Sequence, residues 1–221
     1  GFDEIFIYDT TGCYLNGEKI PGNPLELCNK ILEQWDDNQL SSYAIGYISY
    51  DMKKHLFPHL KFKKTPSQTL MWFGKPKIIK EYKIEKHSKS KNMKNILLHI
   101  DKEIPSNKHY KEKISQIKSY LKLGETYQIN YSNPIEYSYA KSKFELYLYL
   151  REIAQPNNGI YLNTGKNQIL SMSPEKFFEI KNNLIKAYPI KGSINRSKNI
   201  LEDEQLRIKL KNSIKDKAEH L

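Results

Sequence analysis

The 221-residue sequence is 38% hydrophobic and 28% charged, and its formal net charge at pH 7 is +11. This length allows one large domain or two small ones. No apolar run approaches the ~18 residues of a membrane span, so the sequence predicts no membrane partner.

The positive charge comes almost entirely from lysine, since the chain has 33 lysines and 3 arginines. Recognition of bases usually relies on the two parallel hydrogen bonds that a guanidinium group makes. Scattered lysines more often form a solvated face. We therefore predict no nucleic-acid partner. A non-catalytic basic module that binds nucleic acid is the alternative from another functional class.

The cysteines and the N-terminus favour a cytoplasmic protein. The first residues, Gly1–Glu4, are acidic and lead into no long apolar stretch, so no signal peptide is predicted. Cys13 and Cys28 form neither a CxxC pair nor a metal-ligand spacing. A reduced cytoplasmic protein is the expectation, and a single disulfide stays open.

The first 100 residues predict hairpins around one helix. Asn16-Gly17 is a strong hairpin signal, and Pro24 is typical of a helix start. Gly46 lies in an aromatic run, which indicates close approach of another backbone. The predicted elements are strands at 5–8 and 13–15, a helix from 24 to about 36, a buried strand at 43–50, a basic loop at 55–66, strands at 69–73 and 77–84, and a polar linker at 87–95.

The second half predicts helices and an antiparallel meander. Gly124 is a helix stop, and Ser142–Glu145 has the pattern of a capping box. Because regular βαβ alternation is missing, the fold class is α+β rather than a Rossmann sheet. The predicted elements are a helix at 107–123, a strand at 127–131, a helix at 142–154, strands at 160–162, 169–172, 177–180 and 184–188, and a C-terminal helix at 201–221.

Two residues near the meander could carry chemistry. Glu175 follows Ser-Met-Ser-Pro at a strand end and could serve as a general acid or base. Lys191 follows an apolar strand, where desolvation would favour the neutral, nucleophilic amine. Taken singly, each residue also fits a structural interpretation: a glutamate that begins a turn, and a strand-end lysine that faces water.

Glu219 near the end of the chain is a candidate metal ligand. Its neighbour His220 lies on a different helix face, which argues against joint chelation. A carboxylate that combines with ligands from elsewhere would suit Mg²⁺, a hard ion that prefers oxygen.

Four motifs together resemble the chorismate-binding enzymes, which include anthranilate synthase component I, aminodeoxychorismate synthase component I and the isochorismate and salicylate synthases. Their order and spacing both agree with those of the family over about residues 107–221. Gly46–Asp51 also resembles a segment of the family's N-terminal half. The motifs are Gly124-Glu-Thr-Tyr-Gln-Ile-Asn-Tyr-Ser132, Leu170-Ser-Met-Ser-Pro-Glu-Lys-Phe177, Pro189-Ile-Lys-Gly-Ser193 with Arg196, and Ser213-Ile-Lys-Asp-Lys-Ala-Glu-His220.

The resemblance implies an α+β fold of stacked antiparallel sheets with flanking helices. Residues 1–100 would form the N-terminal region of the component I fold, and residues 101–221 the first part of the chorismate-binding domain. The family's later glutamates and its substrate-carboxylate arginine have no counterpart here. The resemblance thus predicts a fragment, truncated at the C-terminus and inactive by itself.

The resemblance also assigns roles to the candidate residues. Lysine at position 191 resembles the aminodeoxychorismate synthase branch, which makes the precursor of p-aminobenzoate and folate, whereas other branches typically have alanine. Lys191 would be the nucleophile, Glu175 the acid/base and Glu219 a ligand of Mg²⁺. The implied partners are chorismate and a glutamine amidotransferase that supplies ammonia. Anthranilate synthase component I is the alternative within the family.

Overall fold

The structure is a computed structural model that describes residues 1–36, 44–62, 69–82, 99–101, 106–190 and 192–220. It divides into two compact units, unit 1 (residues 1–87) and unit 2 (residues 88–221). The expected domain boundary at residue 100 stays a prediction, and the linker predicted at 87–95 lies outside the described residues. In the part of the chain that the structure describes, no helix is long and apolar enough to cross a bilayer.

Unit 1 contains a five-stranded antiparallel sheet with the strand order β3-β2-β1-β5-β4. The predicted first hairpins are confirmed. Asn16 and Gly17 both have positive φ, and Asn16 Oδ1 accepts a hydrogen bond of 2.8 Å from the backbone N–H of Ile5. This side chain therefore ties the second turn back to the first strand. The strands are β1 (Phe2–Asp9), β2 (Gly12–Leu15), β3 (Glu18–Ile20), β4 (Ile45–Ile48) and β5 (Met71–Pro76).

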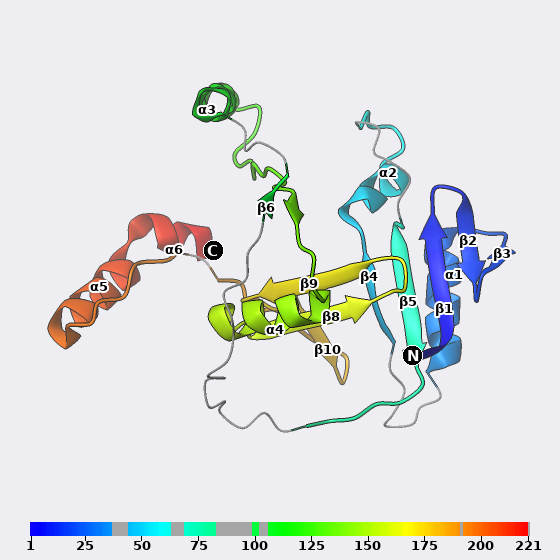
Figure 1. Cartoon of the computed structure of the whole chain (residues 1–221). Coiled ribbons are helices and arrows are strands. Elements are labelled where there is room, and N and C mark those ends of the chain that lie inside the picture. Colours follow the sequence, from blue (N-terminus) through cyan, green and yellow to red (C-terminus); the bar gives the residue numbers. More distant parts are fainter. Residues whose placement is uncertain (37–43, 63–68, 83–98, 102–105, 191, 221) are drawn as a thin grey trace. The chain divides into compact units, whose positions relative to one another are not determined.

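Helix α1 (Pro24–Trp35) packs against this sheet at β1 (Figure 1). Its predicted start is confirmed, because Asn23 Oδ1 accepts hydrogen bonds from the N–H groups of Leu25 and Glu26 at 2.9 and 3.4 Å. The apolar face of α1 meets the inner face of the sheet. The core formed there consists of Phe6, Cys13, Cys28, Ile31, Trp35, Met52, Leu70 and Met71.

Two strand predictions in unit 1 need correction. The strand predicted as buried at 43–50 is β4, whose Ile45 and Ile48 are 43% and 56% exposed, because among the described residues β4 pairs with β5 alone. No strand forms over residues 77–82, since Pro76 ends β5 and cannot donate to a ladder. A short 3₁₀ turn, η1 (Tyr50–Met52), and α2 (Lys53–Leu56) follow β4, and α2 covers the first part of the predicted basic loop.

Unit 2 combines two-stranded antiparallel sheets with helices, which confirms the α+β class. The helix predicted to end at Gly124 is confirmed, and this glycine has a left-handed φ of 74°. The elements are β6 (His99–Ile100), α3 (Asn107–Leu123), β7 (Tyr137–Ser138), α4 (Lys143–Ala154), β8 (Asn158–Asn163), β9 (Gln168–Ser173), β10 (Glu179–Lys181), β11 (Leu184–Lys186), α5 (Ile200–Asn212) and α6 (Ile214–His220).

Helix α4 lies along the β8–β9 hairpin (Figure 1). The ring of Tyr161 in β8 meets Phe144 and Tyr147 of α4 at centroid distances of 5.1 and 5.7 Å. Tyr147 is buried at this contact. The predicted helix start is confirmed, although Ser142 makes no capping bond with its side chain. The aromatic contact supports the hairpin that ends at Ser173.

Two further predictions for unit 2 are wrong. Residues 127–131 alternate as a strand would, yet no ladder forms and Tyr127 is 95% exposed. A strand needs a partner for its backbone groups, and none of the described residues supplies one. The C-terminal helix is interrupted at Ser213, whose ψ of 117° is extended, so that α5 and α6 are separate helices.

Candidate active site

Glu175 lies in a tight turn directly after β9. The Ser173 hydroxyl donates to the carbonyl of Glu175 at 2.8 Å and accepts from its N–H at 3.4 Å. Pro174 restricts the backbone between them, and its carbonyl accepts a bond of 3.3 Å from Asn157 Nδ2. The turn is thus tied to the segment that leads into β8, and the backbone of the half-buried Glu175 is fixed.

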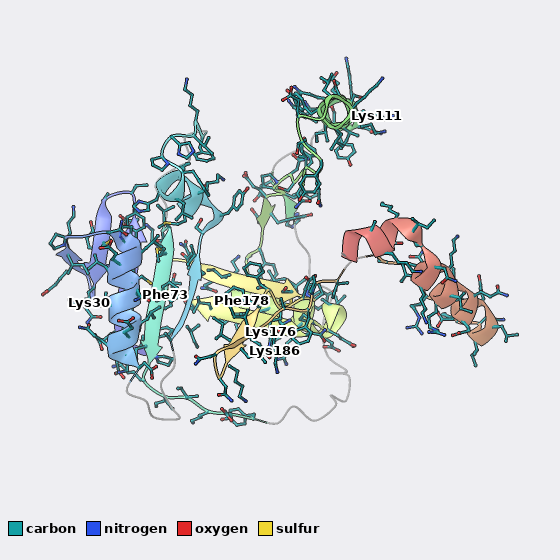
Figure 2. The ribbon with its side chains drawn as sticks, turned by 180° about the vertical axis from the view of Figure 1, so that it is seen from behind. Lys30, Phe73, Lys111, Lys176, Phe178 and Lys186 are labelled. Atoms are coloured by element: carbon teal, nitrogen blue, oxygen red, sulfur yellow. The ribbon has the colours of Figure 1, made fainter. Side chains whose placement is uncertain are left out.

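The residues after Glu175 form a charged and apolar hairpin. Lys176 Nζ pairs with Glu179 Oε2 at 2.6 Å, which lowers the pKa of the Glu179 carboxyl through the hydrogen bond and the positive charge. Figure 2 shows Lys176, Phe178 and Lys186 around this hairpin. Asn182 and Asn183, both at positive φ, make the turn between β10 and β11, the last two strands predicted for the meander.

Lys191 lies outside the described residues, and its neighbour Gly192 lies beside α6. Gly192 has a left-handed φ of 74°, and a Cβ atom added to it would lie 2.8 Å from Cγ and Oδ1 of Asp216. The Asp216 side chain therefore occupies space that any other residue at position 192 would fill. Gly192 thus lies against α6.

Helix α6 begins at a cap that the sequence signals. The Ser213 hydroxyl accepts a bond of 3.2 Å from the N–H of Asp216, and the Ser213 carbonyl accepts one of 3.0 Å from the N–H of Lys217. Glu219 lies in the same helix, three residues after Asp216. Its side chain is outside the described residues, so its role as a metal ligand stays a prediction.

That Glu175, Lys191 and Glu219 come together stays a prediction, because Lys191 and the side chain of Glu219 lie outside the described residues. Gly192, next to Lys191, contacts the helix that carries Glu219. Glu175 lies at the end of the β8–β9 hairpin, and no hydrogen bond joins its carboxylate to another residue in the described ranges. Those ranges also contain no group of three His, Cys, Asp or Glu side chains that could hold a metal. A hollow beside α3, lined by residues 107–115, includes none of the candidates.

Two carboxylates that contact residues 192–197 were not predicted from the sequence. Asp216 contacts Gly192, and Asp203 binds Arg196 through its carboxylate. The pattern Ser213-x-x-Asp216 is a helix-start signature that could have revealed both the interruption and the aspartate. No comparable signal in the sequence joins Arg196 to Asp203, which lie seven residues apart.

The chain is similar to proteins of known family. The chorismate binding enzyme family matches residues 14–221. The chain is 35% identical over 112 residues to aminodeoxychorismate synthase component 1 of Escherichia coli, and 32% identical over 112 residues to anthranilate synthase component 1 of Saccharolobus solfataricus. Each alignment covers 51% of this chain, and 25% and 27% of those relatives, so the aligned part of the chain spans about a quarter of their length.

A solved structure shows the same fold. Anthranilate synthase component I from Streptococcus pneumoniae matches with a TM-score of 0.76 and 16% sequence identity, over all of this chain and 57% of that one. The predicted arrangement of antiparallel sheets with flanking helices is therefore confirmed. Because the family match extends over nearly the whole sequence, the chain belongs to the chorismate binding enzyme family.

Proposed function

We propose that this chain is part of an aminodeoxychorismate synthase component I, which converts chorismate and ammonia to 4-amino-4-deoxychorismate. The observation that carries the proposal is Lys191 in the segment Pro189–Ser193, where the anthranilate and isochorismate branches typically have alanine. The similarity to the Escherichia coli aminodeoxychorismate synthase component 1 supports it.

The proposed reaction replaces one difficult displacement by two easier ones. The neutral amine of Lys191 adds to C2 of chorismate, and the 4-hydroxyl leaves as water with a proton from Glu175. Ammonia then adds at C4, the two ring double bonds, which shifted in the first step, shift back, and the lysine amine leaves from C2. The fixed backbone of Glu175 at the end of β9 suits an acid that must reach one oxygen.

Glu219 is the residue of this chain proposed to hold Mg²⁺. A carboxylate oxygen is the kind of ligand that this ion prefers. When bound, the ion would offset the charge of the substrate's carboxylate. Since the described residues contain no group of three metal ligands, we propose that Glu219 contributes one ligand and that others come from elsewhere.

The proposal includes a second polypeptide that supplies ammonia. The relatives are named component 1, which supports a partner component, and we propose a glutamine amidotransferase for this role. We assign the activity to a polypeptide that also carries the rest of the family domain, because the chain spans 57% of its solved relative. We expect the 221-residue chain by itself to be inactive.

The nucleophile is tested in that longer polypeptide with chorismate. Lys191→Ala should lower the rate of aminodeoxychorismate formation by at least about 10³-fold, since covalent catalysis is removed. With ammonia withheld, mass spectrometry should find a chorismate-derived adduct on Lys191. Lys186→Ala removes an exposed lysine of β11 and serves as the matched control, with an unchanged rate. A fully active Lys191→Ala variant would overturn the proposal.

Anthranilate synthase component I is the second candidate, because the Saccharolobus solfataricus protein of that name is 32% identical. The same assay separates the two. Formation of anthranilate from chorismate and ammonia, with no aminodeoxychorismate, would favour this candidate.

A further inference from the structure

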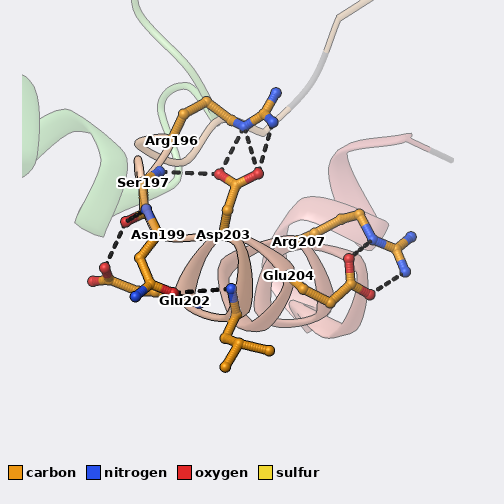
Figure 3. A network of polar contacts seen from close by, with 8 residues as sticks. Arg196, Ser197, Asn199, Glu202, Asp203, Glu204 and Arg207 are labelled. Atoms are coloured by element: carbon orange, nitrogen blue, oxygen red, sulfur yellow. Dashed lines mark hydrogen bonds and ion pairs between the residues drawn. The ribbon is translucent and has the colours of Figure 1, made fainter.

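The segment between Lys191 and α5 is a loop, residues 192–199, without helix or strand. Arg196 lies in its middle and turns its guanidinium group toward Asp203 of α5 (Figure 3). Arg196 Nε donates to Oδ1 and Oδ2 of Asp203 at 2.8 and 3.0 Å, and Nη2 donates to Oδ2 at 2.6 Å. This two-pronged geometry fixes the position and the orientation of the arginine.

The same carboxylate also holds the loop backbone. Asp203 Oδ1 accepts a bond of 3.0 Å from the N–H of Ser197, so both oxygens of this side chain bind the loop. The Asp203 side chain is 20% exposed, whereas that of Arg196 is 86% exposed. The hydrogen bonds from Arg196 and from the Ser197 N–H keep the pKa of Asp203 below its usual value. The carboxylate therefore stays charged at neutral pH.

The loop meets the helices at a second point. Gly192 lies against the Asp216 side chain, near the start of α6. Since α5 and α6 contact each other, the two aspartates belong to one helical pair. The middle of the loop is thus bound to α5, and its first residue lies against α6, the helix that carries Glu219.

We propose that Asp203 and Asp216 are positioning residues, which hold loop 192–199 on the α5–α6 pair and so set the position of Lys191. The role of these two contacts in catalysis rests on the proposed function, in which Lys191 is the nucleophile. The physical reason is that displacement of a reacting group by about 1 Å can cost about 10²-fold in rate. Arg196 acts here as the loop's anchor and not as a ligand of the substrate, because its Nε and Nη2 donors already bind Asp203.

A double-mutant cycle with Asp203→Asn and Arg196→Lys tests the anchor. Asp203→Asn keeps the size of the side chain, Arg196→Lys keeps the positive charge, and each change removes the two-pronged ion pair. We expect each single variant and the double variant to lose about 10–100-fold in kcat, with KM for chorismate changed less than about twofold. The losses should not multiply, because the two residues act as one unit.

Helix α5 offers a matched control. Glu204 and Arg207 form the same kind of pair within the helix, with Arg207 Nε and Nη2 donating at 2.7 and 2.6 Å, and bind no residue of the loop (Figure 3). Glu204→Gln and Arg207→Lys should leave kcat unchanged. In the 221-residue chain, hydrogen exchange of residues 192–199 should speed up in Asp203→Asn and stay unchanged in Glu204→Gln.

Three results would overturn the inference. One is a higher KM for chorismate in Arg196→Lys with kcat unchanged, which would make Arg196 a substrate ligand. The second is a set of kcat losses that multiply in the double variant. The third is unchanged exchange of residues 192–199 in Asp203→Asn. The exchange experiment needs no catalysis, so it decides whether Asp203 holds the loop even if the longer polypeptide makes no aminodeoxychorismate and the proposed function fails.

Discussion

Unit 1 and unit 2 differ in how they use their apolar side chains. Unit 1 buries a continuous core between α1 and a five-stranded sheet. In unit 2 the described residues bury two large hydrophobic side chains, Tyr147 and Leu162, while Phe177 is 87% exposed and Ile185 is 67% exposed. Hydrophobic burial supplies most of the free energy of folding. Unit 1 therefore has an internal source of stability, whereas the unit with the candidate site has little of its own.

The difference is also visible in the sheets. The five strands of unit 1 share one sheet, but unit 2 has pairs of strands in its described ranges. An isolated two-stranded hairpin is at best marginally stable in water. The residues proposed for catalysis thus lie in the region that most needs additional packing, which agrees with a chain that spans 57% of its solved relative.

The sharpest test of this comparison replaces one phenylalanine in each unit. Phe6→Ala, at a fully buried position, should cost about 3–5 kcal/mol because it leaves a cavity in the core. Phe177→Ala should change stability by less than about 0.5 kcal/mol. Trp35 and Trp72, the two tryptophans of the chain, are both in unit 1, so their fluorescence follows its unfolding, and hydrogen exchange of β8 and β9 follows the opening of unit 2. Similar costs at both positions would contradict the comparison.

The next largest effect concerns the buried thiols of unit 1. Burial, with a smaller contribution from the charge of Cys13, raises the pKa of Cys28 to about 11. In the unfolded chain the value is about 8.5. The folded state then binds the proton more tightly, so this stability is complete below about pH 8.5 and is lost as pH rises toward 11.

Denaturation of unit 1 at pH 7 and pH 11 measures the effect. At 1.36 kcal/mol per pKa unit, the wild-type chain should lose up to about 3 kcal/mol through Cys28. Cys28→Ala should have a smaller loss between the two pH values. An equal pH dependence in the two proteins would mean that the Cys28 thiol does not contribute.

A smaller effect distinguishes two glycines of unit 2. Gly124 and Gly192 both have φ of 74°, but a Cβ atom would meet no atom within 4 Å at Gly124 and would meet Asp216 at Gly192. Alanine at either position should cost about 1–2 kcal/mol through backbone strain. Gly192→Ala should cost about 1 kcal/mol more, because the side chain of Asp216 must move.

Opening free energies from hydrogen exchange of α3 and α6 can measure both costs. In an Asp216→Gly background, the excess at Gly192 should disappear while the strain remains. If Gly124→Ala and Gly192→Ala cost the same, the contact between Gly192 and Asp216 does not affect stability.

Local signals in the sequence predicted most elements correctly. Asn16-Gly17, the start of α1 and the end of α3 at Gly124 depend on neighbouring residues, so the sequence reveals them. The strand predicted at 127–131 is wrong because the alternation of apolar and polar residues does not indicate whether a partner strand exists. The prediction of one long C-terminal helix is wrong because the cap at Ser213 begins a second helix.

The candidate site residues were predicted from a resemblance to a family and not from local sequence signals. The residues alone left Glu175 and Lys191 with ordinary structural explanations, and their roles come from the resemblance of four motifs. The contact of Asp203 with Arg196 depends on how the loop folds back on α5, which residue spacing does not indicate. Helices and strands could therefore be predicted from the sequence better than the contacts between them.

Gly46 shows how the sheet of unit 1 limits the changes that evolution or a mutational scan can introduce. It is exposed and lies in β4, which is an edge strand of the sheet among the described residues. Most substitutions are tolerated at such a place. Yet a Cβ atom there would collide with the backbone oxygen of Trp72 and the ring of Phe73. In saturation mutagenesis, position 46 should therefore reject every residue larger than glycine, and its exposure would be a misleading guide to its tolerance.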